Sequence, residues 1–153
     1  MKKTFFIPLL LGLSMIIASL FLVSKNIQQF LDIPTFAITI GLSFIVMLSQ
    51  YSFSEIGRAF KFAFENAEYD EIEIKKGIRF FKTFKNLLVA STVTATFIGF
   101  IAIFSNEKLY AKIGAASAVC ILAVLYIAIM ITFIVIPFQS ALEKRLVSAK
   151  EKN

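Results

Sequence analysis

Hydroxyl side chains gather in one apolar stretch of the chain, in a pattern that a membrane protein can use to handle an ion. Thr92, Thr96 and Gly99 follow the i, i+4, i+7 spacing of one helical face. Hydroxyl oxygens there can replace part of a cation's hydration shell, or lie beside a carboxylate that another chain supplies. We therefore take these three residues as a candidate ion pathway. The alternative is that the threonines bond back to carbonyl groups of their own helix and simply pack.

Other site chemistry has little to build on in this sequence. The chain has 153 residues with one cysteine, Cys120, and no histidine. Neither a Cys–His catalytic pair nor a typical zinc site can be assembled from that inventory. No charged residue lies deep in an apolar run, so the chain by itself holds no titrating carboxylate within a membrane. We expect no enzymatic activity, no metal site and no cofactor.

Four long apolar runs must position the hydroxyl residues. Hydrophobic residues make up 58% of the chain and charged residues only 17%, which is too apolar for a soluble domain of this size. A helix needs about 20 residues to cross a hydrocarbon core. The runs predict an all-α, polytopic membrane protein that is one domain over residues 1–153. Its four spans are expected at residues 4–24, 33–54, 86–106 and 113–141.

The distribution of lysine and arginine predicts how the chain sits in the membrane. Only Lys25, Lys108 and Lys112 lie on one side, and all other cations lie on the side of the two termini and of segment 55–85. That side is expected to be the cytoplasm. The net charge of +6 then suits anionic lipid headgroups, and nucleic-acid binding is not expected.

Short links join the spans in pairs, and one longer polar segment joins the pairs. The links predict two helical hairpins. Segment 55–85 carries apolar residues at helical spacing, which predicts a cytoplasmic helical hairpin that extends spans two and three. The alternative is an interfacial helix that lies flat on the lipid.

The stretch "FLDIPTFAITIG" marks the start of the second span. Asp32 precedes the helical run, and Pro34 lies in its first turn. The Asp32 carboxylate can cap free backbone N–H groups there, while Pro34 loses nothing by lacking its own. This interpretation places Asp32 at the outer headgroup level.

Small residues and a proline shape the fourth span. Gly114 and Ala118 form a small-xxx-small pair that permits close helix approach. The spacing leaves open whether the approaching helix belongs to the same subunit or to another. The span is expected to end near Pro137, after which a helix can continue.

Taken in order, these stretches resemble one membrane-protein family. The sequences "LLLGLSMIIASLFL", "FLDIPTFAITIG" and "YSFSEIGRAFKFAF" resemble the N-terminal half of the flagellar stator A subunit. "ATFIGFIAIF" is similar to the third span of the MotA/TolQ/ExbB proton channel family, with Thr96 and Gly99 at matching positions. "LYIAIMITFIVIPFQSALEKRL" resembles the family's fourth span, with Tyr126 and Pro137 at matching positions.

The resemblance implies a function and partners. It implies a homopentamer in the bacterial inner membrane, arranged around a single-span partner of the MotB/TolR/ExbD type whose membrane Asp carries H⁺ or Na⁺. Thr96, with Thr92 behind it, would line the carboxylate site, and Asp32 and Pro34 would shape the outer entrance.

Two departures from the family pattern suggest a second interpretation. Only the short segment 55–85 stands where the stator subunit has a large cytoplasmic domain. Ala123 and Val124 replace hydroxyl residues of the family's fourth span. The alternative function is therefore a non-conducting four-helix scaffold or accessory protein with the same ring architecture.

Overall fold

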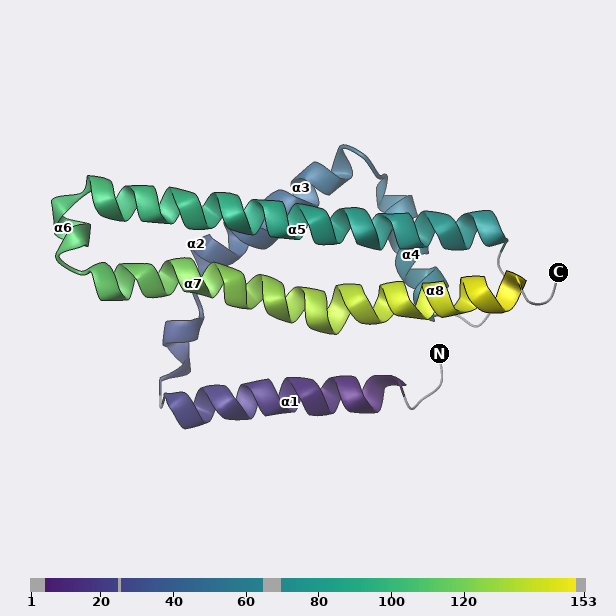
Figure 1. The fold of residues 1–153 in the computed structure, drawn as a ribbon, viewed down its shortest axis with the longest axis horizontal. Helices are drawn as coiled ribbons and strands as arrows, with labels where there is room; N and C mark the ends of the chain where they lie inside the picture. Colours follow the sequence, from purple (N-terminus) through teal and green to yellow (C-terminus); the bar gives the residue numbers. More distant parts are fainter. Residues whose placement is uncertain (1–4, 25, 65–69, 151–153) are drawn as a thin grey trace.

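The computed structural model describes residues 5–24, 26–64 and 70–150, and every regular element among them is helical (Figure 1). The elements in chain order are α1 (Phe6–Val23), η2 (Ile27–Phe30), α2 (Ile33–Phe36), η3 (Ala37–Gly41), α3 (Leu42–Leu48), α4 (Phe53–Phe64), α5 (Glu71–Ser105), α6 (Glu107–Tyr110), α7 (Ile113–Met130), η4 (Ile131–Val135) and α8 (Ile136–Lys150). Four stretches are long and apolar enough to cross a membrane, namely Phe6–Val23, Ile27–Leu48, Glu71–Ser105 and Ile113–Ala149. The predicted all-α class with four such helices is therefore confirmed. Residue 4, where the first span was expected to begin, lies outside the described residues.

The longest contact in the molecule is between α5 and the rod formed by α7, η4 and α8, which lie side by side and are joined through α6 (Figure 1). Three contacts define their antiparallel register. A Cβ on Gly77 would stand 2.9 Å from Leu142, the Phe81 and Phe138 rings stack with centroids 5.8 Å apart, and Gly99 faces Cys120. From one of these contacts to the next, the residue number rises on α5 by as much as it falls on the rod, so one register holds along the whole pair.

The rod does not end at Pro137. The helix continues through it into α8, and the preceding segment η4 is π-helical, with the Ile136 N–H bonded to the Ile131 carbonyl. Proline removes one backbone donor and crowds the preceding turn. A wider π turn accommodates both effects without breaking the helix.

The second apolar stretch stops earlier than predicted. α3 ends at Leu48, and a turn at residues 49–52 leads into the separate helix α4. Ser52 and Glu55 form a capping box at this start: the Ser52 N–H donates to Glu55 Oε2 at 2.8 Å, and the Glu55 N–H donates to Ser52 Oγ at 3.4 Å. This corrects the prediction that span two runs to residue 54 and continues unbroken. α5, in contrast, is one helix from segment 55–85 into the third span.

α1 is the least embedded of the four apolar spans. None of its residues is buried, and it lies on the α7–α8 side of the molecule, away from α3 (Figure 1). It touches the rod where Phe133 comes within 3.0 Å of a Cβ on Gly12, and Phe6 stacks on Phe64 of α4. The first two spans, predicted as an antiparallel pair, are therefore not packed on each other. α3 instead packs on α5, where Phe44 meets Phe84.

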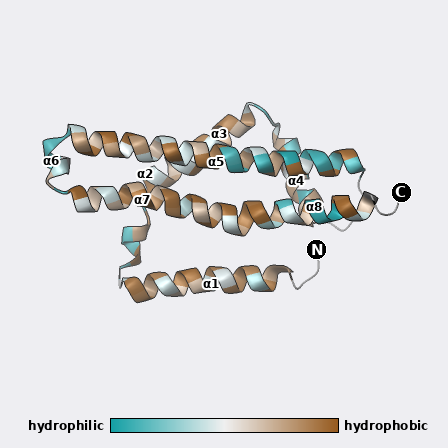
Figure 2. Ribbon diagram, in the orientation of Figure 1, coloured by the Kyte–Doolittle hydropathy of each residue, from teal (hydrophilic) through white to brown (hydrophobic). Residues whose placement is uncertain are grey.

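Polar side chains collect at one end of the molecule, which we call the polar end: α4, residues 71–85 of α5, and residues 139–149 of α8 (Figure 2). Beneath this polar surface lies an aromatic core. Phe60 of α4 makes edge contacts with Phe80, Phe81 and Phe138. Phe81 is fully buried. These contacts hold α4, α5 and α8 together at the polar end.

Candidate functional site

Among the described residues, four hydroxyl residues of η3, α3 and α5 are buried. They are Thr39, Ser43, Ser91 and Thr92. Ser43 Oγ lies 2.8 Å from the Thr39 carbonyl and 3.0 Å from Ser91 Oγ, so its single hydrogen serves one of them at a time. Thr39 donates to the Thr35 carbonyl at 2.7 Å within the π-helical segment. Back-bonding of this kind competes with the helical ladder and accompanies its local widening.

The threonines of this part of α5 differ in the hydrogen bonds that their hydroxyl groups form. Thr92 Oγ1 donates to the Leu88 carbonyl at 2.8 Å, and Thr94 Oγ1 donates to the Ala90 carbonyl at 3.0 Å. For these two threonines the packing alternative describes the geometry. Thr96 Oγ1 is buried and has no hydrogen-bond partner among the described residues.

The register of the bundle gives Thr96 no partner on the neighbouring helix α7. Since Gly99 faces Cys120, the same antiparallel register places Thr96 level with Ala123. Ala123 is 1% exposed, and its methyl group offers neither a donor nor an acceptor. A buried hydroxyl without a partner costs about 1–3 kcal/mol relative to a satisfied one. The Thr96 hydroxyl is thus a group in this span to which a further molecule can add a missing hydrogen bond.

Gly99 is a position of close helix contact. A Cβ built on it would stand 2.5 Å from the Cys120 sulfur, a separation that real side chains do not tolerate. One turn further along α5, Ile103 is also buried. The structure therefore brings Thr92, Thr96 and Gly99 together on one face of α5, and this face points into the subunit's own bundle.

Asp32 and Pro34 form the start of α2. Asp32 is its N-cap and accepts the Thr35 N–H on Oδ2 at 2.9 Å, with Pro34 in the first turn. Tyr126 of α7 reaches the same point: its hydroxyl accepts the Asp32 N–H at 2.7 Å and donates to the Phe30 carbonyl at 2.8 Å. Sequence reasoning found the cap but missed the Tyr126 bridge, which joins residues more than 90 positions apart.

No protein-family model and no curated protein sequence matches this chain. The geometry therefore carries the functional argument.

The predicted packing residues fall into two groups. Tyr126 packs within the subunit, with its ring edge on to Phe36 at a centroid distance of 5.8 Å, and Pro137 follows the π turn. Gly114 and Ala118 are exposed, and a Cβ on Gly114 would meet nothing within 4 Å. The small pair thus makes no close helix approach among the described parts of this subunit. Its surface is open to lipid or to another chain.

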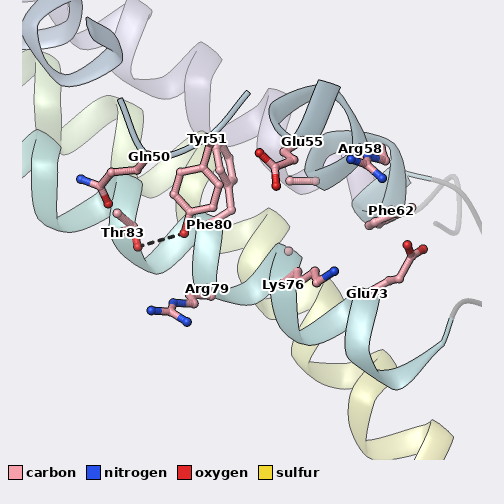
Figure 3. A pocket seen from close by; sticks show the side chains of 12 residues that line it. Gln50, Tyr51, Glu55, Arg58, Phe62, Glu73, Lys76, Arg79, Phe80 and Thr83 are labelled. Carbon is pink, nitrogen blue, oxygen red and sulfur yellow. Dashed lines mark hydrogen bonds between the residues drawn. The ribbon is translucent and has the colours of Figure 1, made fainter. Parts of the chain in front are cut away.

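A charged cleft at the polar end was not predicted. It encloses about 370 Å³ between the 49–52 turn, α4 and α5 (Figure 3). Its lining includes the charged residues Glu55, Arg58, Glu73, Lys76 and Arg79. The basic bias of segment 55–85 and the Ser52–Glu55 capping box were visible signals. Recognising the cleft also required knowing that α4 crosses α5 toward α8 (Figure 1).

Proposed function

We propose that this chain is an inner-membrane ion-channel subunit that surrounds a single-span partner and converts H⁺ or Na⁺ flow into motion of that partner. The observation that supports this most directly is the buried, unpartnered hydroxyl of Thr96. Within a membrane, a polar atom of this kind gains most from a partner that another chain or an ion brings. The partner's membrane Asp is the group we propose.

The surroundings of Thr96 suit a proton- or ion-carrying carboxylate. Thr92 lies one turn before Thr96 on the same face of α5, and the buried methyl group of Ala123 lies opposite and does not compete for a hydrogen bond. Each elementary charge that crosses the membrane gains about 2.3 kcal/mol per 100 mV, which is enough to bias a conformational step. At the start of α2, Asp32, whose N–H bonds to Tyr126, and Pro34 would shape the outer entrance.

The exposed surfaces are consistent with the proposed assembly. Gly114 and Ala118 open outward, and α1 buries none of its side chains in the subunit. In the proposed homopentamer, these surfaces face neighbouring copies or lipid. We propose the bacterial inner membrane as the location, with both termini and the polar end facing the cytoplasm, because lysine and arginine are concentrated there.

The alternative function is a non-conducting scaffold or accessory protein with the same ring architecture. One observation favours it: Gly99 contacts Cys120 and Thr92 bonds to its own helix. Two of the three candidate pathway residues are therefore used in packing within the subunit.

The deciding experiment is gentle extraction of the complex from its native membrane, followed by mass spectrometry and particle imaging. The channel proposal expects a pentamer with a co-purifying single-span protein that carries a membrane Asp. Five copies around a lipid-filled centre would support the scaffold instead, and a monomer or dimer would contradict both.

Ion movement is then measured in vesicles that contain the extracted complex. Thr96→Val is expected to abolish H⁺ or Na⁺ flux while the complex still assembles. Thr94→Val is the matched control, because that hydroxyl is exposed and bonded to its own helix. Equal flux in the two variants would remove Thr96 from the pathway.

A further inference from the structure

The charged cleft has two walls that come from different helices. Arg58 and Glu55 stand on α4, and Lys76 and Glu73 stand on α5 opposite them (Figure 3). Arg79 lines the cleft further along α5, and its side chain points away from Arg58 and Lys76 (Figure 3). The cleft thus carries three cationic and two acidic side chains around one opening.

The cations of the cleft are not neutralised by close ion pairs. In the ranges 5–24, 26–64 and 70–150, no carboxylate lies within ion-pair distance of Lys76 or Arg79. Arg58 makes a long contact of 3.4 Å from Nε to the Ser54 carbonyl of its own helix. The lining carries three cations against two carboxylates, and this net positive charge favours an anion beside the cations.

Of the two acidic residues in the cleft, Glu55 already accepts hydrogen bonds from a neighbouring residue. Glu55 accepts hydrogen bonds from the Ser52 N–H at 2.8 Å and from the Ser52 hydroxyl at 2.9 Å. The backbone bond, followed by the hydroxyl bond and the charges of Arg58 and Lys76, lowers the pKa of Glu55. Glu55 therefore stays charged at neutral pH, and the oxygens of Glu55 and Glu73 can accept hydrogen bonds from hydroxyl groups of a ligand.

An apolar path leads from the cleft along the α3–α5 contact. Tyr51 packs edge on to Phe80 in the cleft wall, and Phe80 stacks on Phe84. Phe44 of α3 packs on Phe84 and remains 37% exposed. A ligand with a polar head in the cleft can therefore lay an apolar tail against the exposed edge of this path.

We propose that the cleft binds the headgroup of a hydroxyl-bearing anionic phospholipid of the phosphatidylglycerol type. Arg58 and Lys76 hold the phosphate from the two walls, and Arg79 adds positive charge at the rim. Glu55 and Glu73 accept hydrogen bonds from the headgroup hydroxyls. The acyl chains run along Phe44. This proposal is independent of ion conduction and of any partner protein.

Native mass spectrometry of the intact chain in detergent tests the proposal, with phosphatidylglycerol and phosphatidylcholine offered at equal concentrations. The protein is expected to retain phosphatidylglycerol about tenfold more strongly, equivalent to about 1.4 kcal/mol. The double variant Arg58→Gln/Lys76→Gln is expected to lose that preference. The matched control Lys82→Gln/Lys85→Gln removes two exposed cations of α5 that do not line the cleft, and it is expected to keep the preference.

Two further arms make the result decisive. The charge-conserving variant Arg58→Lys/Lys76→Arg is expected to keep the lipid preference, which separates loss of the site from misfolding. Inorganic phosphate at millimolar concentration is expected not to displace the lipid. Equal loss in the cleft and control variants would show general attraction to the basic surface, and displacement by phosphate would show a site for the free anion. Either result overturns the proposal, as does an absence of preference in the unmodified protein.

Discussion

Gly99 of α5 lies directly against Cys120 of α7, with the sulfur 2.5 Å from the place that a Cβ on Gly99 would occupy. This contact belongs to the same register as the stacking of Phe81 on Phe138. Because the register is constant along the pair, it also decides that Ala123 lies level with Thr96. The register therefore places a methyl group, which cannot form a hydrogen bond, opposite the unpartnered hydroxyl of Thr96.

Substituting Gly99→Ala is expected to destabilise the subunit. The new methyl group must displace the Cys120 side chain or push α5 away from α7, and overpacking of this kind costs about 1–3 kcal/mol. Thermal unfolding in detergent, monitored by circular dichroism, measures the loss.

Shortening the opposing side chain provides the control for that substitution. The double variant Gly99→Ala/Cys120→Ala is expected to recover most of the stability, because the two sites are in direct contact and their effects are not additive. Simple addition of the two single effects would show that the contact does not control helix packing.

Thr96→Val is expected to stabilise the isolated subunit by about 1 kcal/mol, because it replaces an unsatisfied buried hydroxyl by an apolar group of the same shape. Thr94→Val is expected to leave the melting temperature nearly unchanged. A marked destabilisation by Thr96→Val would mean that its hydroxyl already has a partner in the subunit. Gain of stability in the subunit together with loss of ion flux in the complex would assign the hydroxyl to the proposed pathway.

Tyr126→Phe is expected to loosen the start of α2. The change keeps the ring contact with Phe36 but removes the hydroxyl that bonds the Phe30 carbonyl and the Asp32 N–H. Two lost bonds cost about 1–3 kcal/mol in total. Hydrogen exchange of residues 31–37 should accelerate, while exchange in the middle of α5 should not change.

Asp32→Asn separates the Tyr126 bridge from the cap. Asparagine caps a helix about as well as aspartate, and the Asp32 N–H that Tyr126 accepts is a backbone group, so exchange should stay near that of the unmodified protein. Strong acceleration would show that the negative charge of Asp32 itself holds this turn.

The Glu55 cap predicts a pH dependence at the start of α4. Its bonds to Ser52 lower the pKa of the folded state from the ordinary value of 4.5. A lowered pKa contributes stability that is fully present above 4.5 and is lost as the pH falls through the folded value. The unmodified protein should therefore melt at a higher temperature than Glu55→Gln at pH 7.

That difference should close as the pH is lowered below 4.5, because a protonated glutamate resembles glutamine. Melting curves of both proteins in the same detergent across this range give the comparison. A difference that stays constant with pH would contradict a role for the charge.

Local pattern determined much of this protein from its sequence. The length of four apolar runs determined four helices, and Asp32 followed by Pro34 determined where α2 begins, because capping depends on only a few consecutive residues. The spacing of Thr92, Thr96 and Gly99 likewise placed them on one face, since helical periodicity is a local property.

Tertiary structure decided which of those residues are satisfied and which are left open. The back-bonds of Thr92 and Thr94, the orphaned hydroxyl of Thr96 and the bridge from Tyr126 to Asp32 depend on helix register and side-chain geometry. The cleft exists because the helix breaks after Leu48 and α4 then crosses α5 toward α8. Apolar periodicity predicts that one face of a helix is buried. Close packing among segments that are distant in the sequence determines which residues that face contacts.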